Sequence, residues 1–387
     1  MNRYYFDHNA TTPVAGEVLA ALNFVLGEAI GNPSSVHREG QLARHRVEEA
    51  RRRVAALLGC QPAEVVFTSG GTEANNLAVL GAVRASGRRD RHVITTAIEH
   101  PAVLNPSAQL QREGAAVSYV GVSSAGVVDP DDIRREISPG TVLISVMHAN
   151  NETGALQPVE AIGRIAREND VLFHVDGVQA AGKLPLDLKR MPADLYSISA
   201  HKFYAPKGAG ALYVRKGVKL QPLQYGGRHE RERRAGTENV PGVAAMGAAA
   251  VLAGKLLATE MPRQQDLRDR LERGVLDRVP QASVNSGTAP RIANTAGIRF
   301  EGIDGEALVI ALDLRGFAVS SGSACSSGAV EPSHVLLAMG LSPEQARSSL
   351  RFSLGRQNTA EQVEALIDAV AECAAHLRRL SPSFSHA

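Results

Sequence analysis

The strongest constraint on the fold is an alternation between short apolar segments and segments of helical period, which runs from about residue 43 to residue 215. The apolar segments have the length of strands, and several are rich in Val and Ile, as strands buried on both faces of a mostly parallel sheet are. They are Glu64–Thr68, His92–Thr96, Ala116–Val120, Val142–Met147, Val171–Val175, Leu195–Ser199 and Gly210–Val214. This pattern is typical of an α/β fold with helices on both faces of the sheet.

Polar residues that follow these apolar segments indicate where a ligand would bind. The five groups are Thr72, Glu99-His100, Asn150-Asn151-Glu152, Asp176 and His201-Lys202. In an open α/β sheet the ligand crevice lies at the carboxyl ends of the strands. We therefore expect the five groups to converge on one site.

The length of the chain, 387 residues, exceeds the roughly 250–300 residues at which a single hydrophobic core stops growing. After about residue 260 the pattern changes to a polar helical stretch followed by alternating strand-like and helical segments. These segments are Arg263–Arg278, Thr295–Phe300, Gly305–Leu314 and Ser348–Leu354. We predict a large domain with a mostly parallel central sheet over residues 13–259, and a smaller α+β domain made of residues 1–12 and 260–387.

Composition and charge exclude several classes of protein. Three cysteines with no CxxC spacing predict neither a disulfide framework nor a metal site. A formal charge of +2, with no basic block interleaved with aromatics, predicts binding to neither nucleic acid nor a membrane surface. The longest apolar run, Val243–Gly254, is shorter than the roughly twenty residues that span a bilayer and predicts a buried helix. With no secretory signal visible, we expect a cytoplasmic protein.

A glycine-rich turn, Ser69-Gly70-Gly71-Thr72-Glu73, follows the apolar Val65–Phe67 and precedes a predicted helix. Backbone N–H groups at the start of a helix, here around Gly71, and the hydroxyl of Thr72 would hold a phosphate. The turn lacks the Gly-Lys-Ser/Thr of a P-loop and the GxGxxG of a dinucleotide site. An ordinary turn with a helix cap is the alternative.

Lys202 and Asp176 each follow an apolar strand. A lysine in such a place could form a Schiff base, and an aspartate could pair with a protonated pyridine nitrogen, which are the two groups that pyridoxal phosphate requires. His100 could lie over a cofactor ring or move protons. Each residue alone has a simpler explanation, as a solvated lysine, a capping aspartate or a structural histidine. Their joint occurrence with a phosphate turn favours a cofactor site.

Cys325 lies in the segment Ser320–Gly328, whose other residues are all Ser, Gly or Ala. Such a segment can bury little apolar area, so we expect it to be exposed and mobile and Cys325 to be a candidate nucleophile. Cys60 and Cys373 have apolar neighbours and are predicted to be packing residues. Arg351 could clamp a carboxylate through two hydrogen bonds, or be a surface arginine.

These motifs occur in the order seen in cysteine desulfurases, and the chain resembles that family over essentially its whole length. The segments that carry the resemblance are Tyr5–Pro13, Gly31–Ser35, Phe67–Glu73, Glu99-His100, Asn150–Gly154, His174–Gln179, His201-Lys202, Arg234–Thr237, Ser320–Cys325 and Arg351–Leu354. The resemblance is to the branch that contains the nitrogen-fixation and housekeeping enzymes of iron–sulfur cluster assembly. It implies the type I fold of pyridoxal phosphate-dependent transferases and membership of the class V aminotransferase superfamily.

The resemblance also implies roles for individual residues. Lys202 would hold pyridoxal 5'-phosphate covalently, Asp176 would pair with its pyridine nitrogen, and His100 would stack on its ring. The remaining implied cofactor contacts are Gln179 and Asn151 at the phenolic oxygen, and Gly71, Thr72, Ser199, His201 and the second subunit's Thr237 at the phosphate. Arg351 and Asn151 would bind the substrate, while Cys325, carried by the small domain, would be the nucleophile. Thr237 makes a homodimer part of the implied site.

The implied reaction converts L-cysteine to L-alanine and leaves the sulfur as a persulfide on Cys325, for delivery to an iron–sulfur scaffold or another sulfur-acceptor protein. A selenocysteine lyase or another class V aminotransferase-like enzyme is the enzymatic alternative, although aminotransfer needs no nucleophilic thiol. A sulfur carrier or scaffold without catalytic activity is the third hypothesis. It would use Cys325 but would not need Lys202, Asp176 and His100 together.

Overall fold

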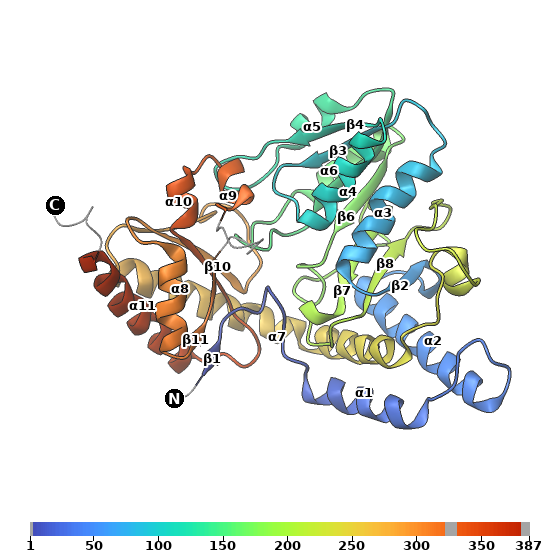
Figure 1. Cartoon of the computed structure of the whole chain (residues 1–387), viewed down its shortest axis with the longest axis horizontal. Helices are drawn as coiled ribbons and strands as arrows, with labels where there is room; N and C mark the ends of the chain where they lie inside the picture. The colour runs from blue at the N-terminus through green and yellow to red at the C-terminus, as the bar shows by residue number, and fades with distance from the viewer. Residues whose placement is uncertain (1–2, 322–330, 381–387) are drawn as a thin grey trace.

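A seven-stranded sheet with the order β2-β8-β7-β6-β5-β3-β4 forms the centre of the larger part of the molecule (Figure 1). Its strands are β2 (Val65–Thr68), β3 (His92–Thr96), β4 (Ala116–Val120), β5 (Thr141–Met147), β6 (Leu172–Asp176), β7 (Leu195–Ser199) and β8 (Gly210–Val214). Among these described strands, β8 alone runs opposite to the others. The computed structural model describes residues 3–321 and 331–380. It confirms the mostly parallel sheet, and each predicted strand lies within one residue of its expected bounds.

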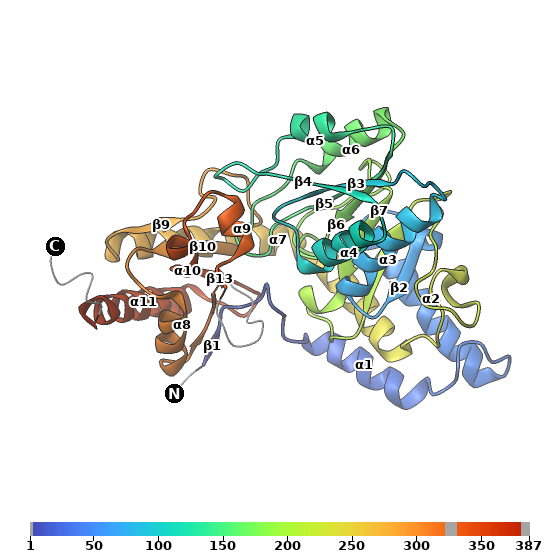
Figure 2. The same cartoon turned by 45° about the horizontal axis from the view of Figure 1, so that its top comes forward.

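Helices cover both faces of this sheet (Figure 2). The helical elements of this part of the chain, with 3₁₀ helices written η, are α1 (Gly16–Glu28), α2 (Arg38–Leu58), η1 (Pro62–Glu64), α3 (Gly71–Ala85), α4 (Pro101–Arg112), α5 (Pro130–Glu136), α6 (Val159–Glu168), η2 (Ala200–Lys202) and η3 (His229–Glu232). Successive strand residues enter opposite cores, as strand geometry requires. Val65 and Phe67 pack with α2 on one face, whereas Val66 packs with α3 on the other. The strands are therefore apolar throughout because both faces are buried.

One helix of 39 residues, α7 (Val240–Arg278), joins the larger part to the smaller part. Its first half, including Val243 and Ala249, packs in the core of the large sheet, and its second half, including Leu267 and Leu271, packs in the core of the smaller part. The sequence suggested two separate helical segments here. By length and composition α7 would be able to span a bilayer, but half of its most apolar window is buried inside the protein. The prediction of a buried helix is confirmed.

The smaller part is built on a four-stranded antiparallel sheet with the order β12-β13-β10-β9. Its elements are β9 (Ala282–Val284), β10 (Thr295–Phe300), α8 (Gly305–Leu314), β11 (Phe317–Ala318), β12 (Ser320–Ser321), α9 (His334–Ala338), α10 (Pro343–Arg347), β13 (Ser349–Ser353) and α11 (Ala360–Leu380). The N-terminal strand β1 (Tyr4–Tyr5) pairs with β11, and Phe6 enters this core. The chain passes from one core to the other within α7. The predicted domain boundaries, with residues 13–259 in the large domain and residues 1–12 and 260–387 in the small one, stay a prediction.

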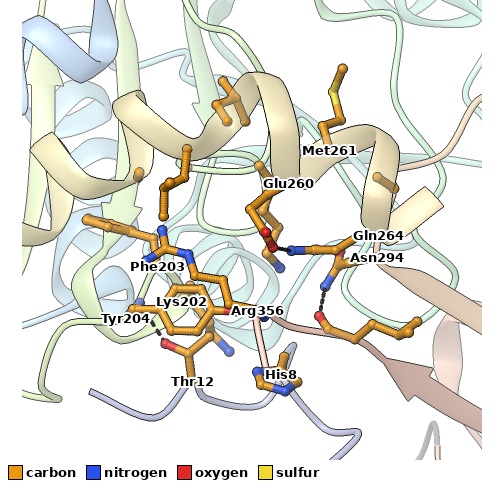
Figure 3. Close-up of a pocket in the computed structure, with 17 residues that line it drawn as sticks. His8, Thr12, Lys202, Phe203, Tyr204, Glu260, Met261, Gln264, Asn294 and Arg356 are labelled. Atoms are coloured by element: carbon orange, nitrogen blue, oxygen red, sulfur yellow. Dashed lines mark hydrogen bonds between the residues drawn. The ribbon is translucent and has the colours of Figure 1, made fainter. Parts of the chain in front are cut away.

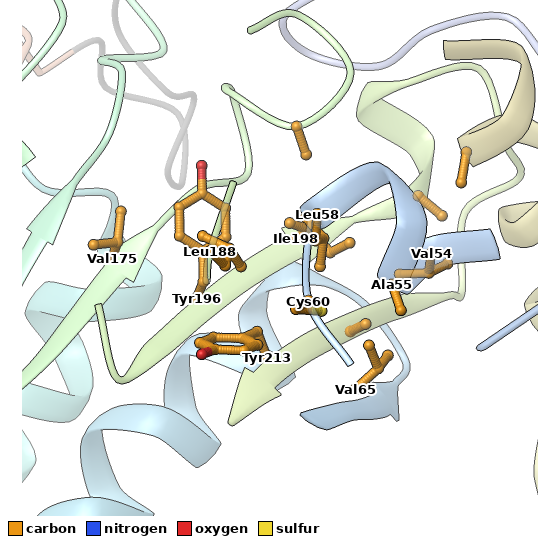
Figure 4. Close-up of a cluster of buried hydrophobic side chains, with 14 of the residues drawn as sticks. Val54, Ala55, Leu58, Cys60, Val65, Val175, Leu188, Tyr196, Ile198 and Tyr213 are labelled. Atoms are coloured by element: carbon orange, nitrogen blue, oxygen red, sulfur yellow. The ribbon is translucent and has the colours of Figure 1, made fainter. Parts of the chain in front are cut away.

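Gly177, directly after β6, lies against a fully buried ring. A Cβ added at this position would lie 1.8 Å from Cε1 of Tyr196. The Tyr196 ring is enclosed by the core (Figure 4), and its hydroxyl lies 2.9 Å from Nδ1 of His148. The ring therefore has no free space into which to move.

We predict that Gly177→Ala destabilises the protein by about 1–3 kcal/mol through overpacking, measured as a lower melting temperature. Gly121→Ala is the matched control, because a Cβ at Gly121 meets nothing within 4 Å. Equal melting temperatures for the two variants would contradict this account of the core.

Candidate active site

A cavity of about 220 Å³ lies at the carboxyl ends of the parallel strands. Its lining residues are Gly71, Thr72, Asn75, His100, Ala102, Met147, Ala149, Asn151, Asp176, Val178, Gln179, Ser199, His201 and Lys202. We call it the active-site cavity. Each of the five polar groups expected to converge contributes at least one residue. Glu99, Asn150 and Glu152 do not line it, because they are buried beside it and bond to the surrounding loops.

The glycine-rich turn brings the N-terminus of α3 to one wall of the active-site cavity. A Cβ at Gly71 would lie 2.7 Å from Cγ2 of Val178 and 3.3 Å from Cβ of Ser199. The absence of a side chain therefore allows the turn to pack against both residues. The first N–H groups of a helix have no partner within the helix. With Thr72 and Ser199 beside them, they form a set of donors suited to an anion.

Asp176 ends β6, and its buried carboxylate is held by two donors. Oδ1 accepts from the backbone N–H of Val178 at 3.0 Å, and Oδ2 accepts from Nδ2 of Asn75 at 2.6 Å. Burial raises the pKa of Asp176, while these two donors and the nearby His100 and Lys202 oppose that rise. The sequence analysis missed Asn75. Its signal is its position three residues after Thr72 on a helix, which places both on one face.

Lys202 lies in η2 and lines the active-site cavity. Its Nζ donates to the carbonyl oxygens of Asn9, at 2.6 Å, and Ala10, at 2.8 Å. Burial and, to a lesser extent, Arg351 lower the pKa of Lys202 to about 8, against the opposing effects of Asp7 and Asp176. An amine with this pKa is largely neutral in mildly alkaline solution, which is the form that attacks a carbonyl.

His100 caps the N-terminus of α4 and lines the active-site cavity. Its Nδ1 accepts from the backbone N–H of Ala102 at 3.0 Å. Burial lowers the pKa of His100, Asp176 opposes this effect, and Lys202 and His334 act in the same direction as burial. The ring is therefore neutral near pH 7, with its proton on Nε2. A neutral ring of this kind can stack on a planar ligand and hold a proton for transfer.

Asn9, which the sequence analysis quoted within a motif but gave no role, connects the active-site cavity to the smaller part. Its Nδ2 donates to Oγ1 of Thr295 at 2.8 Å and to the carbonyl of Asn151 at 3.1 Å. Its own carbonyl accepts from Nε2 of Gln179 at 2.9 Å and from Lys202. Asn9 thus contacts one lining residue, Asn151, through its side chain and two others, Gln179 and Lys202, through its main-chain carbonyl.

Arg351 lies on β13 and does not line the active-site cavity. Its Nη2 donates to Oδ1 of Asp7 at 2.7 Å, and its Nη1 donates to the carbonyl of Asn151 at 3.1 Å. Nε of Arg351 is buried and has no hydrogen-bond partner among the described residues. The substrate-binding role of Arg351 stays a prediction.

Thr237, like Arg351, does not line the active-site cavity. Thr237 is exposed and follows Arg234, whose Nε donates to Oε1 of Glu73 at 2.8 Å. Cys325 lies outside the described residues. On the C-terminal side of that segment, Nε2 of His334 donates to the carbonyl of Glu99 at 2.9 Å. The roles of Thr237 and Cys325 stay predictions.

Comparison with known proteins defines the class of protein. The family model for aminotransferase class-V matches residues 4–366. A cysteine desulfurase IscS from Methanosarcina thermophila is 46% identical, over 98% of this chain and 93% of that protein. A cysteine desulfurase from Nostoc sp. is 47% identical, over 99% of this chain and 95% of its own length.

Solved structures agree with this class. A NifS-like protein has a TM-score of 0.91 and 38% identity, covering 97% of this chain and 100% of that chain. SspA in complex with cysteine has a TM-score of 0.81 and 36% identity, covering 90% of this chain and 98% of that chain. The chain belongs to the aminotransferase class-V family, and within it to the cysteine desulfurases.

We predict that the amine of Lys202 titrates near pH 8 in protein free of cofactor, because burial disfavours its charged form. Acetylation at a series of pH values, followed by peptide mass spectrometry, measures this midpoint. The ordinary pKa of a lysine side chain is about 10.4, and the exposed Lys216 is the internal control for the reactivity of the reagent. Arg351→Met should raise the Lys202 midpoint, because it removes a cation and frees Asp7. Equal midpoints for Lys202 and Lys216 would contradict the prediction.

Proposed function

We propose that the protein is a pyridoxal 5'-phosphate-dependent cysteine desulfurase, which converts L-cysteine to L-alanine and transfers the sulfur as a persulfide for iron–sulfur cluster assembly or other sulfur-transfer biosynthesis. The observation that carries the proposal is the convergence of Lys202, Asp176 and the α3 turn on one cavity, in a chain similar to cysteine desulfurases over almost its full length.

The residues of the active-site cavity fit this cofactor. Lys202 supplies an amine with a lowered pKa, and Asp176 supplies a buried carboxylate for a ring nitrogen. The α3 turn, with Thr72, Ser199 and His201, supplies neutral donors for a phosphate at the other end. Burial lowers the pKa of His201 to about 4, so its ring binds as a neutral group. When bound, pyridoxal phosphate supplies an electron sink for the carbon that bears the substrate's amino group.

Proton movement is assigned to residues whose pKa values suit it. Asp176 favours a proton on the ring nitrogen facing it, because a buried carboxylate without a cationic partner is unfavourable. Lys202, as an amine with a pKa of about 8, is the base for the proton on the substrate's α-carbon. His100 holds a proton at Nε2, available to the substrate's departing group.

Sulfur transfer is assigned to Cys325. Its thiolate attacks the sulfur of the substrate, a sulfur–sulfur bond forms, and the carbon–sulfur bond of the substrate breaks with its electrons left on carbon. A proton then completes alanine. The described residues on both sides of the Cys325 segment support this assignment, since Ser320 pairs with Arg351 in the sheet and His334 bonds to Glu99.

We predict that Cys325→Ala abolishes the formation of alanine from L-cysteine while the protein keeps its bound cofactor. Alanine is measured by chromatography, and the persulfide on Cys325 by mass spectrometry of the wild-type protein. Cys60→Ala is the matched control and should keep wild-type turnover. The Cys60 thiol is buried (Figure 4), and burial raises its pKa to about 12. Wild-type turnover in Cys325→Ala would refute the assignment of the nucleophile.

We further propose a homodimer in which Thr237 completes the neighbouring site. The loop that carries Thr237 is held by Glu230, whose carboxylate accepts from both Nη atoms of the buried Arg51 at 2.7 and 2.8 Å. Apolar side chains of α1 and of the residues just after it are exposed on the same larger part, including Phe24 at 53%, Leu26 at 58% and Ile30 at 79%. Exposed apolar groups of this kind are what a subunit interface buries.

We predict that light scattering gives twice the mass of one chain. Ile30→Asp should weaken the dimer if α1 and its surroundings form the interface, whereas Leu314→Asp, an exposed residue of the smaller part, should leave the mass unchanged. A monomer at micromolar concentration would overturn the dimer.

The proposed function also includes a sulfur acceptor, which is an iron–sulfur scaffold or another protein.

A further inference from the structure

Lys183 lies in the turns after β6 and contacts the active-site cavity only through another residue. Its Nζ donates to Oε1 of Gln179 at 2.7 Å and to Oδ1 of Asn9 at 2.9 Å. Gln179 lines the active-site cavity, whereas Lys183 lines a second cavity of about 30 Å³ behind Lys202 (Figure 3). We call this second space the rear cavity. Lys202 lines both cavities, and the two lysines bond to different oxygens of Asn9, Lys202 to the main-chain carbonyl and Lys183 to Oδ1.

The contact from Lys183 fixes which end of the Gln179 amide faces the active-site cavity. The oxygen and nitrogen ends of a glutamine amide are similar in size, so packing alone distinguishes them poorly. The carbonyl oxygen of Asn9 can only accept, so it takes its hydrogen bond from the NH₂ group of Gln179, and Nζ of Lys183 donates to the amide oxygen at the other end. The amide oxygen of Gln179 must therefore face Lys183, and its NH₂ group must point the other way. One NH₂ hydrogen is used by the carbonyl of Asn9, at 2.9 Å from Nε2, which leaves the second for a ligand.

Asn9 holds Lys183 in place from the other side. Oδ1 of Asn9 accepts from both Nζ of Lys183 and Nδ2 of Asn294, the latter at 3.1 Å. Its Nδ2 is already used by Thr295 and Asn151, so the Asn9 amide cannot reverse without losing several bonds. Both acceptors of Lys183 are therefore oxygens of oriented amides.

The surroundings of Lys183 do not explain it as a member of an ion pair. Among the described residues, no carboxylate lies within 4.0 Å of its Nζ. Burial and the cations Lys202 and Arg351 lower the pKa of Lys183. The other charged and titratable groups of the rear cavity are His8, Lys202, Tyr204, Glu260 and Arg356. A lysine in this position has an unfavourable electrostatic environment, and its two amide acceptors are the interactions that it gains.

We propose that Lys183 is a positioning residue, which fixes the Gln179 amide with its NH₂ group toward the active-site cavity so that Gln179 donates a hydrogen bond to an anionic oxygen of the bound ligand. The inference rests on the proposed function, under which that oxygen is the phenolate of pyridoxal phosphate. Lys183 itself does not touch the ligand.

The test is the pH dependence of the visible absorbance of the cofactor bound to Lys202. When the linkage between Lys202 and the cofactor loses its proton, the phenolate depends more on hydrogen-bond donors from the protein. A missing donor therefore disfavours the deprotonated form and raises the pH midpoint of the absorbance change. We expect Lys183→Met and Gln179→Leu each to raise the midpoint by about one unit. The double variant should shift no further than Gln179→Leu alone. Lys189→Met, which changes an exposed lysine of the same region, should leave the midpoint unchanged.

Several outcomes would overturn the proposal. If Lys183 acted only through its charge, Lys183→Met would shift the midpoint equally in the Gln179→Leu background. A lower melting temperature with an unchanged midpoint would indicate a purely structural role. Should Lys183→Met fail to fold, Lys183→Arg keeps donor groups and is expected to keep the wild-type midpoint, so a raised midpoint would contradict the proposal. Failure of the proposed function would look different, because the wild-type protein would then show no visible band.

Discussion

The network of hydrogen bonds around Asn9 is the constraint on which the site depends. Asn9 is 1% exposed, and its backbone and side chain together bond to residues from β10, β13, the loop after β5, the turns after β6 and η2. The partners are Ser353, Thr295, Asn294, Asn151, Gln179, Lys183 and Lys202. An unsatisfied buried polar group costs about 1–3 kcal/mol, so this network has few alternative arrangements. The distance between the two cores is thereby tied to the position of Lys202.

The same network concentrates positive charge in a chain whose formal charge is only +2. Beyond burial, Arg351 lowers the pKa values of both Lys183 and Lys202, and Lys202 also lowers that of Lys183, while Asp7 and Asp176 oppose the effect on Lys202. His8, which is buried with both ring nitrogens unpartnered among the described residues, has its pKa lowered to about 4 by burial and adds no charge. A pocket with this balance attracts ligands that carry a phosphate or a carboxylate.

Much of the fold and part of the site could be predicted from the sequence because their signals are local. Strands buried on both faces appear as apolar runs, and parallel strands deliver the residues after them to one edge, which is how Thr72, Asp176 and Lys202 were found. Asn75, Asn9 and Lys183 were given no role, since each has a partner that is distant in the chain. Asn75 bonds to a residue 101 positions away, and Asn9 bonds to Lys183 and Lys202, which are 174 and 193 positions away. The continuity of α7 was missed because its composition changes from apolar to polar where it passes between the cores.

Because both cores bury part of α7, the two parts of the molecule share one element of secondary structure. A helix of 39 residues is roughly 58 Å long at about 1.5 Å per residue, and neither part can melt without removing packing from that shared rod. Folding of the cofactor-binding sheet and of the smaller sheet should therefore be thermodynamically coupled. Any change in the angle between them requires α7 to bend, most easily near Pro262, where the proline removes a backbone hydrogen bond. A small bend of α7 near Pro262 therefore displaces the whole C-terminal part of the molecule.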